Sequence, residues 1–230
     1  MNSKKIKIII PSYNCTNKLF FVIRNLRLHS INNEIYIIDD NSLVKSKLII
    51  NYVKDKFSKI IIIKNNKNLG QGGSIKKAFR YLKSENLICT MDDDGQHETH
   101  DVKNIISKYN KINYSNSIIL GSRRLNYRST PINSYIGNKI SKFIFFLLTK
   151  NKIVDTQTGL RFYSVLLANK FLKIKSNGFD FHNIMNYFLI KNQIKYKEII
   201  IKTIYFDNNK KTRFKGIQDS IKILKKIYSY

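Results

Sequence analysis

The stretch Leu87-Ile88-Cys89-Thr90-Met91-Asp92-Asp93-Asp94-Gly95-Gln96 joins an apolar run to three consecutive carboxylates and a glycine. The apolar run predicts a buried strand, with the acids at its carboxyl end. On an extended backbone, Asp92 and Asp94 point to the same side. Three adjacent acids repel one another unless a cation neutralises them, which favours an oxygen-ligated divalent metal that holds phosphates. A solvated acidic turn is the alternative that the motif alone leaves open.

Apolar strand-like runs alternate with helical patterns on both sides of this stretch. Strands are predicted at Ile6–Ile10, Ile35–Ile38, Ile60–Ile63, Leu87–Met91 and Ser117–Leu120. Helices are predicted at Thr16–Leu28, Leu48–Phe57, Gly73–Leu82 and Val102–Tyr109. This alternation predicts an α/β fold with a mostly parallel sheet flanked by helices.

The second half of the chain is less regular. The patterns predict helices at Tyr135–Leu148 and Phe179–Ile190, a loop at Asp155–Gly159, strands at Leu160–Tyr163 and Ile199–Tyr205, a basic loop at Asp207–Lys215 and an amphipathic helix at Ile217–Tyr228. With no linker or repeat in between, we expect a single domain over 1–230. We expect it to have two halves, 6–125 and 126–230.

Polar residues stand at the predicted carboxyl end of four strands. They are Pro11-Ser12-Tyr13-Asn14, Asp39-Asp40-Asn41-Ser42, Asp92–Asp94 and Gly121-Ser122-Arg123-Arg124. Ligands of such sheets bind beyond this edge. The coincidence predicts one shared site.

Together with Asn68-Leu69-Gly70-Gln71-Gly72-Gly73-Ser74, these motifs resemble family-2 glycosyltransferases in their order and spacing. Within that family, Gly121-Ser122-Arg123 and the Asp155–Gly159 segment are most similar to polyprenyl-phosphate sugar transferases. The resemblance runs from residue 6 to about 225, and it implies that the half 6–125 binds the nucleotide sugar and the half 126–230 faces the acceptor. It implies a GT-A nucleotide-binding fold and an inverting, metal-dependent transfer from a nucleotide-diphosphate sugar to a lipid-phosphate or cell-envelope glycan acceptor.

The resemblance also implies roles for individual residues. Asp39 would contact the nucleobase, and Pro11 and Tyr13 would line its wall. The nucleotide-binding set is Pro11, Tyr13, Asn14, Asp39, Gly70, Asp92 and Asp93, and the metal set for Mg²⁺ or Mn²⁺ is Asp92, Asp94 and Gln96. These are hard oxygen donors, which suit such metals. Gly70 also permits a simpler interpretation, as a flexible start to the following helix.

Arg123 and Asp155 are the candidate catalytic residues on the acceptor side. The resemblance places Arg123 against phosphate, a geometry that a guanidinium matches. Asp155 would be the general base for a hydroxyl acceptor, whereas an anionic phosphate acceptor needs none. Arg161 either pairs with Asp155 or contacts substrate.

Three departures from the resembled family concern the acceptor side. The segment 131–138 lacks the arginine that relatives often carry, and Lys139 or Lys142 would have to replace it. Relatives have an acidic start to the helix that corresponds to Phe179–Ile190, and here only Asp180 of it remains. We interpret the nearby His182 as an ordinary helix residue. We also expect no membrane-spanning segment at the carboxyl end, which many polyprenyl-phosphate sugar transferases have.

Other site chemistries fit the sequence less well. An EF-hand loop has acids at alternate positions over five residues, then a glycine, and an acid at its twelfth position. Here Gly95 follows Asp94 directly, and the twelfth position counted from Asp92 is Lys103. His97 and His100 have the wrong spacing for the helical zinc motif. The glycine-rich run lacks the Lys-Ser/Thr of a P-loop.

The net charge of +27, from 42 basic and 15 acidic residues, favours anionic partners. Compositional bias toward lysine explains the charge equally well.

The longest apolar run, Phe143–Leu148, is too short to span a membrane, and we interpret it as core rather than as a membrane contact. Two cysteines and a strand-like start predict a cytoplasmic protein. The positive charge and the family resemblance predict that it is peripheral at the inner membrane face. A nucleic-acid-binding module and a catalytically silent scaffold are the rival functions, and scattered lysines and intact acids speak against them.

Overall fold

The computed structural model describes residues 6–82, 87–110, 117–124, 130, 132–202 and 204. Its strands are β1 (Ile6–Ser12), β2 (Glu34–Asp39), β3 (Ile60–Lys64), β4 (Leu87–Thr90), β5 (Ser117–Arg123), β6 (Arg161–Ser164) and β7 (Lys195–Ile201). Its helices are α1 (Lys18–Leu28), α2 (Val44–Lys56), α3 (Gly70–Phe79), α4 (Thr99–Asn110), α5 (Ile132–Thr149), α6 (Val165–Phe171) and α7 (Phe181–Lys191).

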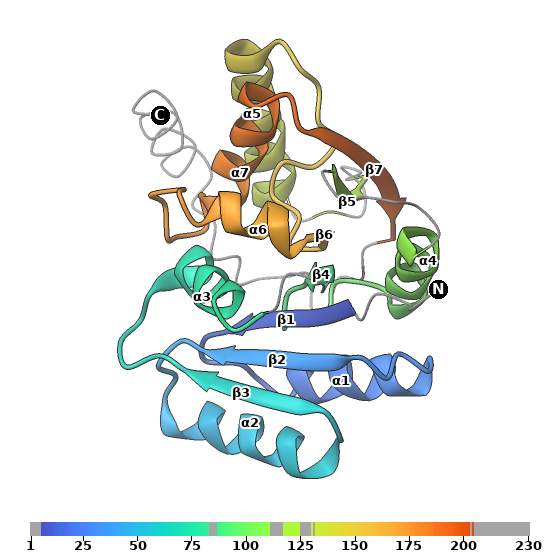
Figure 1. The fold of residues 1–230 in the computed structure, drawn as a ribbon, viewed down its shortest axis with the longest axis vertical. Helices are drawn as coiled ribbons and strands as arrows, with labels where there is room; N and C mark the ends of the chain where they lie inside the picture. Colours follow the sequence, from blue (N-terminus) through green and yellow to red (C-terminus); the bar gives the residue numbers. More distant parts are fainter. Residues whose placement is uncertain are drawn as a thin grey trace.

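The described strands form one sheet in the order β3-β2-β1-β4-β6-β5-β7 (Figure 1). Strand β6 is antiparallel to β4 and β5, whereas the other paired neighbours are parallel. The prediction of a mostly parallel sheet is therefore confirmed. Because β6 lies between β4 and β5, the second half of the chain is inserted into the sheet that the first half begins.

Burial on both faces explains why the strands are continuously apolar. In β1, Ile8, Ile9 and Ile10 are completely buried, as in parallel sheets covered on both sides. One core cluster contains Ile9 with side chains of α3, α6 and α7, and the other contains Ile8 and Ile10 with side chains of α1, α2 and α4. The chain is thus an αβα sandwich.

Several boundaries differ from the predictions. Helix α2 begins at Val44 rather than at Leu48, and α3 begins at Gly70 rather than at Gly73. Helix α6 was not predicted, because its seven residues are too few to show a helical period. Strand β7 begins at Lys195 rather than at Ile199. The prediction missed its first residues because they include lysines, which an edge strand can leave exposed. The predicted basic loop Asp207–Lys215 and helix Ile217–Tyr228 lie outside the described residues.

No helix among the described residues is both long and apolar enough to cross a bilayer. The segment Phe143–Leu148 belongs to α5 and is divided between two environments. Phe145 is core, as predicted, but Phe143 and Leu147 are 62% and 51% exposed. The interpretation of this run as core is therefore only partly right.

Candidate active site

The carboxyl ends of β1, β2, β4 and β5 bring the predicted residues to one edge of the sheet. Ser12 and Asp39 end β1 and β2 and are register partners, and Asp92 follows β4 by two residues. Arg123 ends β5. The shared direction of these strands places their polar ends together, as the sequence predicted.

Asp92, Asp93 and Asp94 are each held by a different partner. Gln71 Nε2 donates a hydrogen bond to Asp92 Oδ1 at 2.9 Å. Ser12 Oγ donates to Asp93 Oδ2 at 2.7 Å, which ties the acids to the end of β1. The backbone amide of Gln96 donates to Asp94 Oδ1 at 3.0 Å. The acidic segment is therefore a fixed turn rather than a loose one.

Close packing and mutual repulsion make Asp92 a strongly perturbed acid. Burial raises the pKa of Asp92 to about 7, with further increases from Asp94, Asp93 and Asp155 that Arg123 only partly offsets. A Cβ atom at Gly159 would lie 2.3 Å from Asp92 Oδ2. Position 159 thus needs glycine for the carboxylate to fit, and the surplus negative charge there favours a bound cation.

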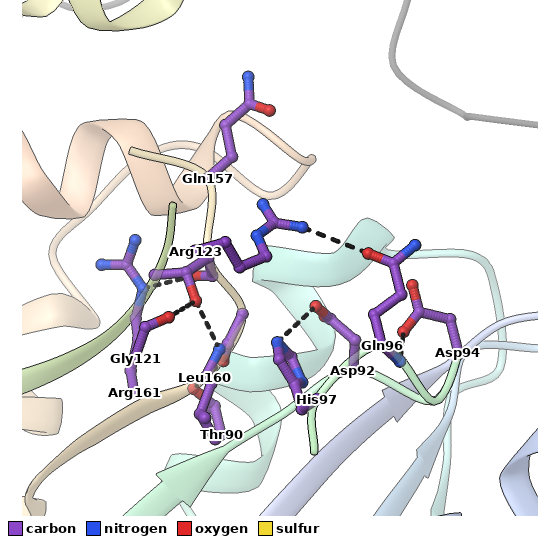
Figure 2. Close-up of polar contacts among 12 residues, drawn as sticks. Thr90, Asp92, Asp94, Gln96, His97, Gly121, Arg123, Gln157, Leu160 and Arg161 are labelled. Carbon is purple, nitrogen blue, oxygen red and sulfur yellow. Dashed lines mark hydrogen bonds and ion pairs between the residues drawn. The ribbon is translucent and has the colours of Figure 1, made fainter. Parts of the chain in front are cut away.

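The predicted metal ligands supply two carboxylates and one amide oxygen. Figure 2 shows Asp92, Asp94 and Gln96 on the same loop, with the Gln96 side chain directed toward Arg123. Within the described residues, no group of three or more His, Cys, Asp or Glu side chains is arranged to hold a metal. Two carboxylates fit a Mg²⁺-type ion whose remaining ligands are waters and substrate phosphates. The ligand set stays a prediction.

Asp155 and Arg123 form a buried ion pair. Arg123 Nε lies 2.6 Å from Asp155 Oδ2, and the Asp155 side chain is completely buried. Asn138 Nδ2 and the Gln157 amide donate to Asp155 Oδ1 at 3.3 and 3.0 Å. Burial alone would raise the pKa of Asp155, but the charge and hydrogen bonds of Arg123 outweigh it and lower that pKa. Asp155 is therefore an ionised, fully engaged carboxylate.

Arg123 connects this pair to the acidic loop. Its Nη1 donates to Gln96 Oε1 at 3.3 Å, a contact drawn in Figure 2. The guanidinium thus lies between Asp155 and the predicted metal ligands. This is a suitable place for a group that attracts phosphate.

Arg161 does not pair with Asp155, which corrects one of the two interpretations of this residue. It is completely buried and donates to the Thr158 carbonyl at 2.9 Å and to Asn186 Oδ1 at 2.8 Å. Arg161 therefore joins β6 to α7 from inside the protein. Asp155 is paired with Arg123 instead because β5 delivers that guanidinium directly.

Among the residues predicted to bind the nucleotide, Asp39 is nearly completely buried, and its Oδ1 accepts a hydrogen bond from the Ser42 amide at 2.9 Å. Asn14, in the left-handed region at φ 51°, accepts from the Leu43 amide at 2.9 Å. Tyr13 is 39% exposed and Pro11 is half-buried beside them. The structure thus gathers Pro11, Tyr13, Asn14 and Asp39 at one end of β1 and β2.

Asp40 organises the loop that leads into α3. Its two oxygens accept from Asn65 Nδ2 and from the amides of Leu69 and Gly70, all at 2.7 or 2.8 Å. Gly70 has φ +78°, and a Cβ there would lie 2.6 Å from the Asn177 carbonyl oxygen. Glycine is required for the backbone geometry at this position, and a contact of Gly70 with the nucleotide stays a prediction.

Two positioning residues were missed by the sequence analysis. Gln71 orients Asp92 from the first turn of α3, and nothing in the sequence separates it from any surface glutamine. Glu198 on β7 accepts from Ser122 Oγ at 2.5 Å and from the Val154 amide at 2.9 Å. These two residues directly precede Arg123 and Asp155. Such a bridge is visible only once β7 is paired with β5.

Two buried histidines lie near the site. Nε2 of His97 is 3.9 Å from Asp92 Oδ2. Burial lowers the pKa of His97 to about 4 and that of His182 to well below its usual value. Both rings are therefore neutral. Neither His182 nitrogen has a hydrogen-bond partner in the described part of the chain, consistent with the interpretation of His182 as a helix residue.

Solved structures with the same fold are glycosyltransferases. The crystal structure of glucosyl-3-phosphoglycerate synthase from Mycobacterium tuberculosis with Mn²⁺, UDP and phosphoglyceric acid matches with a TM-score of 0.68 over 98% of this chain and 78% of that chain, at 11% identity. Mannosyl-3-phosphoglycerate synthase from Rubrobacter xylanophilus matches with a TM-score of 0.67 over 98% and 72%, at 11% identity. At such identities the likeness shows the fold, which is the GT-A fold of glycosyltransferases.

The model of the glycosyl transferase family 2 matches residues 7–172. This chain belongs to that family and is a glycosyltransferase. It is 31% identical over 226 residues to UDP-N-acetylglucosamine–dolichyl-phosphate N-acetylglucosaminyltransferase of Methanococcus voltae, covering 89% of this chain and 88% of that protein. It is 24% identical over 229 residues to dolichyl-phosphate β-glucosyltransferase of Saccharomyces cerevisiae, covering 89% and 68%. The predicted fold and family are confirmed.

Proposed function

We propose that this enzyme transfers a sugar, with inversion, from a nucleotide-diphosphate sugar to the phosphate of a polyprenyl phosphate, with Mg²⁺ or Mn²⁺ as cofactor. The two relatives named above are dolichyl-phosphate sugar transferases by name, and one structural neighbour was crystallised with Mn²⁺ and UDP. The enzyme would act in the cytoplasm, peripherally at the inner membrane face.

The state of Asp155 is the observation that favours a phosphate over a hydroxyl acceptor. A hydroxyl must lose a proton to a general base during attack. Asp155 was the candidate, but its lowered pKa and its bonds to Arg123, Asn138 and Gln157 make it a poor base. A phosphate acceptor is already anionic and needs no proton removed.

In the proposed reaction, a phosphate oxygen of the acceptor attacks the anomeric carbon as the bond to the nucleoside diphosphate breaks. Arg123 would attract the acceptor phosphate, and Asp155 would hold the guanidinium in place. Gln71 and Ser12 would keep Asp92 and Asp93 oriented toward the diphosphate. Asp92, Asp94 and Gln96 would hold the divalent metal, which would supply positive charge to neutralise the leaving group.

A double substitution, Asp92→Ala/Asp94→Ala, tests this proposal. We expect the rate of sugar transfer to polyprenyl phosphate to fall at least ~10²-fold, because charge stabilisation at the leaving group is lost. The rate is measured by mass spectrometry of the glycolipid product. Asp55→Ala, which removes an exposed acid on α2, should keep full activity. Near-normal transfer by the folded double variant would refute the proposed site. Transfer only to hydroxyl acceptors would refute the proposed acceptor.

A further inference from the structure

Helix α5 forms one wall of the active site with its inner face. Asn138 is 2% exposed and bonds to Asp155, as described above. One turn further, Ser141 lies 2.9 Å from Thr156 Oγ1 and donates to Asn183 Oδ1 at 3.0 Å. Phe145 continues this face into the core. The inner face therefore fixes the loop that carries Asp155.

The outer face of α5 is apolar although it faces solvent. Ile132, Ile136, Phe143 and Leu147 are 72%, 47%, 62% and 51% exposed. At 3.6 residues per turn, these positions fall within about 60° of the helix circumference. A solvent-facing helix surface is normally polar, and an exposed apolar row marks a surface that contacts something else.

Positive charge accompanies this row. Lys139 lies on the same side of α5 and is exposed, and Lys150 and Lys152 are exposed just beyond its end. The sequence of α5 contains no Asp or Glu. Helix α2 also exposes an apolar row, Leu48 and Tyr52, but Asp55 lies on that face. The surface of α5 is therefore complementary to a partner that is both apolar and anionic.

We propose that the outer face of α5 docks on the surface of an anionic lipid bilayer. Apolar side chains would enter the headgroup boundary, and the lysines would bind anionic lipid headgroups. This inference rests on the proposed function, because a polyprenyl phosphate carries its phosphate at the bilayer surface. Docking through α5 would bring that phosphate to the wall of the site that holds Asp155 and Arg123. Figure 1 shows α5 with α7 at one end of the molecule and α2 at the other.

The test is vesicle co-sedimentation of the full-length protein carrying Phe143→Asp/Leu147→Asp. Compared with the unsubstituted protein, we expect this variant to associate at least ~10-fold more weakly with phosphatidylglycerol-containing vesicles. Neither the variant nor the unsubstituted protein should associate strongly with vesicles of phosphatidylcholine alone. Leu28→Asp/Leu48→Asp is the matched control, since it adds the same charge at two exposed leucines of α1 and α2. That control should bind anionic vesicles nearly as well as the unsubstituted protein.

Two measurements decide what a changed or unchanged result means. Unchanged vesicle binding by the α5 variant would overturn the proposal. A lowered melting temperature of the α5 variant would also overturn it, because the protein itself would then cover this face. The loss of a dimer by the variant in sedimentation velocity would overturn it too, because a second copy would then cover the face. Transfer to a water-soluble short-chain isoprenyl phosphate should be retained by the α5 variant. If the unsubstituted enzyme fails to use that acceptor, the proposed function fails while the vesicle result still tests the docking surface.

Discussion

At the scale of the residue, Asp155 shows how two opposing effects set the state of one carboxylate. Burial disfavours its charge, and the adjacent guanidinium and the donors around it favour that charge more strongly. The opposite balance holds at Asp92, where neighbouring acids reinforce the effect of burial. Two aspartates in one site therefore differ in their surroundings: Asp155 is paired with Arg123, whereas Asp92 lies among other acids, as a ligand of the proposed metal would.

Asp155→Asn should reveal this difference through pH. The pKa of Asp155 is lower in the folded protein than in the unfolded chain, where it is about 4, so the ion pair contributes stability above pH ~4 and loses it as pH falls further. At pH 7 we expect the variant to lose roughly 3–5 kcal/mol in its free energy of unfolding. Urea denaturation from pH 7 to pH 3 should show that gap narrowing below pH ~4. A gap of constant size, or an equal loss in Asp55→Asn, would contradict the assignment.

At the scale of the element, β7 stabilises the site from a distance. The strand pairs with β5 along its whole length, and its edge position explains the exposed Lys195 and Lys197. Glu198 points the other way and bridges Ser122 with Val154. One carboxylate thus fixes the approach of both the Arg123 strand and the Asp155 loop.

Glu198→Ala should lower kcat more than it lowers Mn²⁺ affinity. The substitution removes the carboxylate that accepts hydrogen bonds from Ser122 Oγ and the Val154 amide, which costs about 1–3 kcal/mol of stability. Because these two residues precede Arg123 and Asp155, we also expect the Arg123–Asp155 pair to be held less firmly. Steady-state kinetics with Mn²⁺ titration separates the two effects, and Lys197→Ala on the same strand is the control. Wild-type kcat in the Glu198 variant would show that the bridge is only structural.

Other elements show where sequence patterns succeed and fail. The buried strands β1 to β4 were predicted nearly to their ends, because apolar runs between helices are a local signal. Helix α6 is too short for such a signal, and β7 alternates lysine with apolar residues as edge strands do. The pairing of Asp155 was also missed, since Arg161 is near in sequence whereas Arg123 is 32 residues away.

At the scale of the whole molecule, the chain combines an αβα sandwich with a net charge of +27. The charge alone does not separate an enzyme of anionic substrates from a nucleic-acid-binding protein. The fold and family do make that separation, since they define a glycosyltransferase. Which nucleotide the site accepts is a property that ligand binding can measure.

A thermal-shift panel of UDP-, GDP- and dTDP-sugars, with and without Mn²⁺, should identify the donor. A ligand at 100 times its Kd stabilises the native state by about 2.7 kcal/mol, which for a chain of this size corresponds to roughly 5–10 °C in melting temperature. We expect one nucleotide class to give this shift, and the shift to depend on Mn²⁺. Asp92→Ala/Asp94→Ala should lose the metal-dependent part. A shift with random duplex DNA but with no nucleotide sugar would favour the nucleic-acid alternative.

The amino-acid sequence was sufficient to predict the α/β class, the family and the edge of the sheet where the acids lie. These depend on local periodicity and on short motifs at strand ends, which neighbouring residues encode. The tertiary structure was needed to show that Asp155 pairs with Arg123, that Gln71 and Glu198 contact the site residues, and that the described part of the chain leaves the outer face of α5 exposed. Each of these depends on which side chains meet, or fail to meet, across elements distant in sequence, because packing rather than local pattern selects those neighbours.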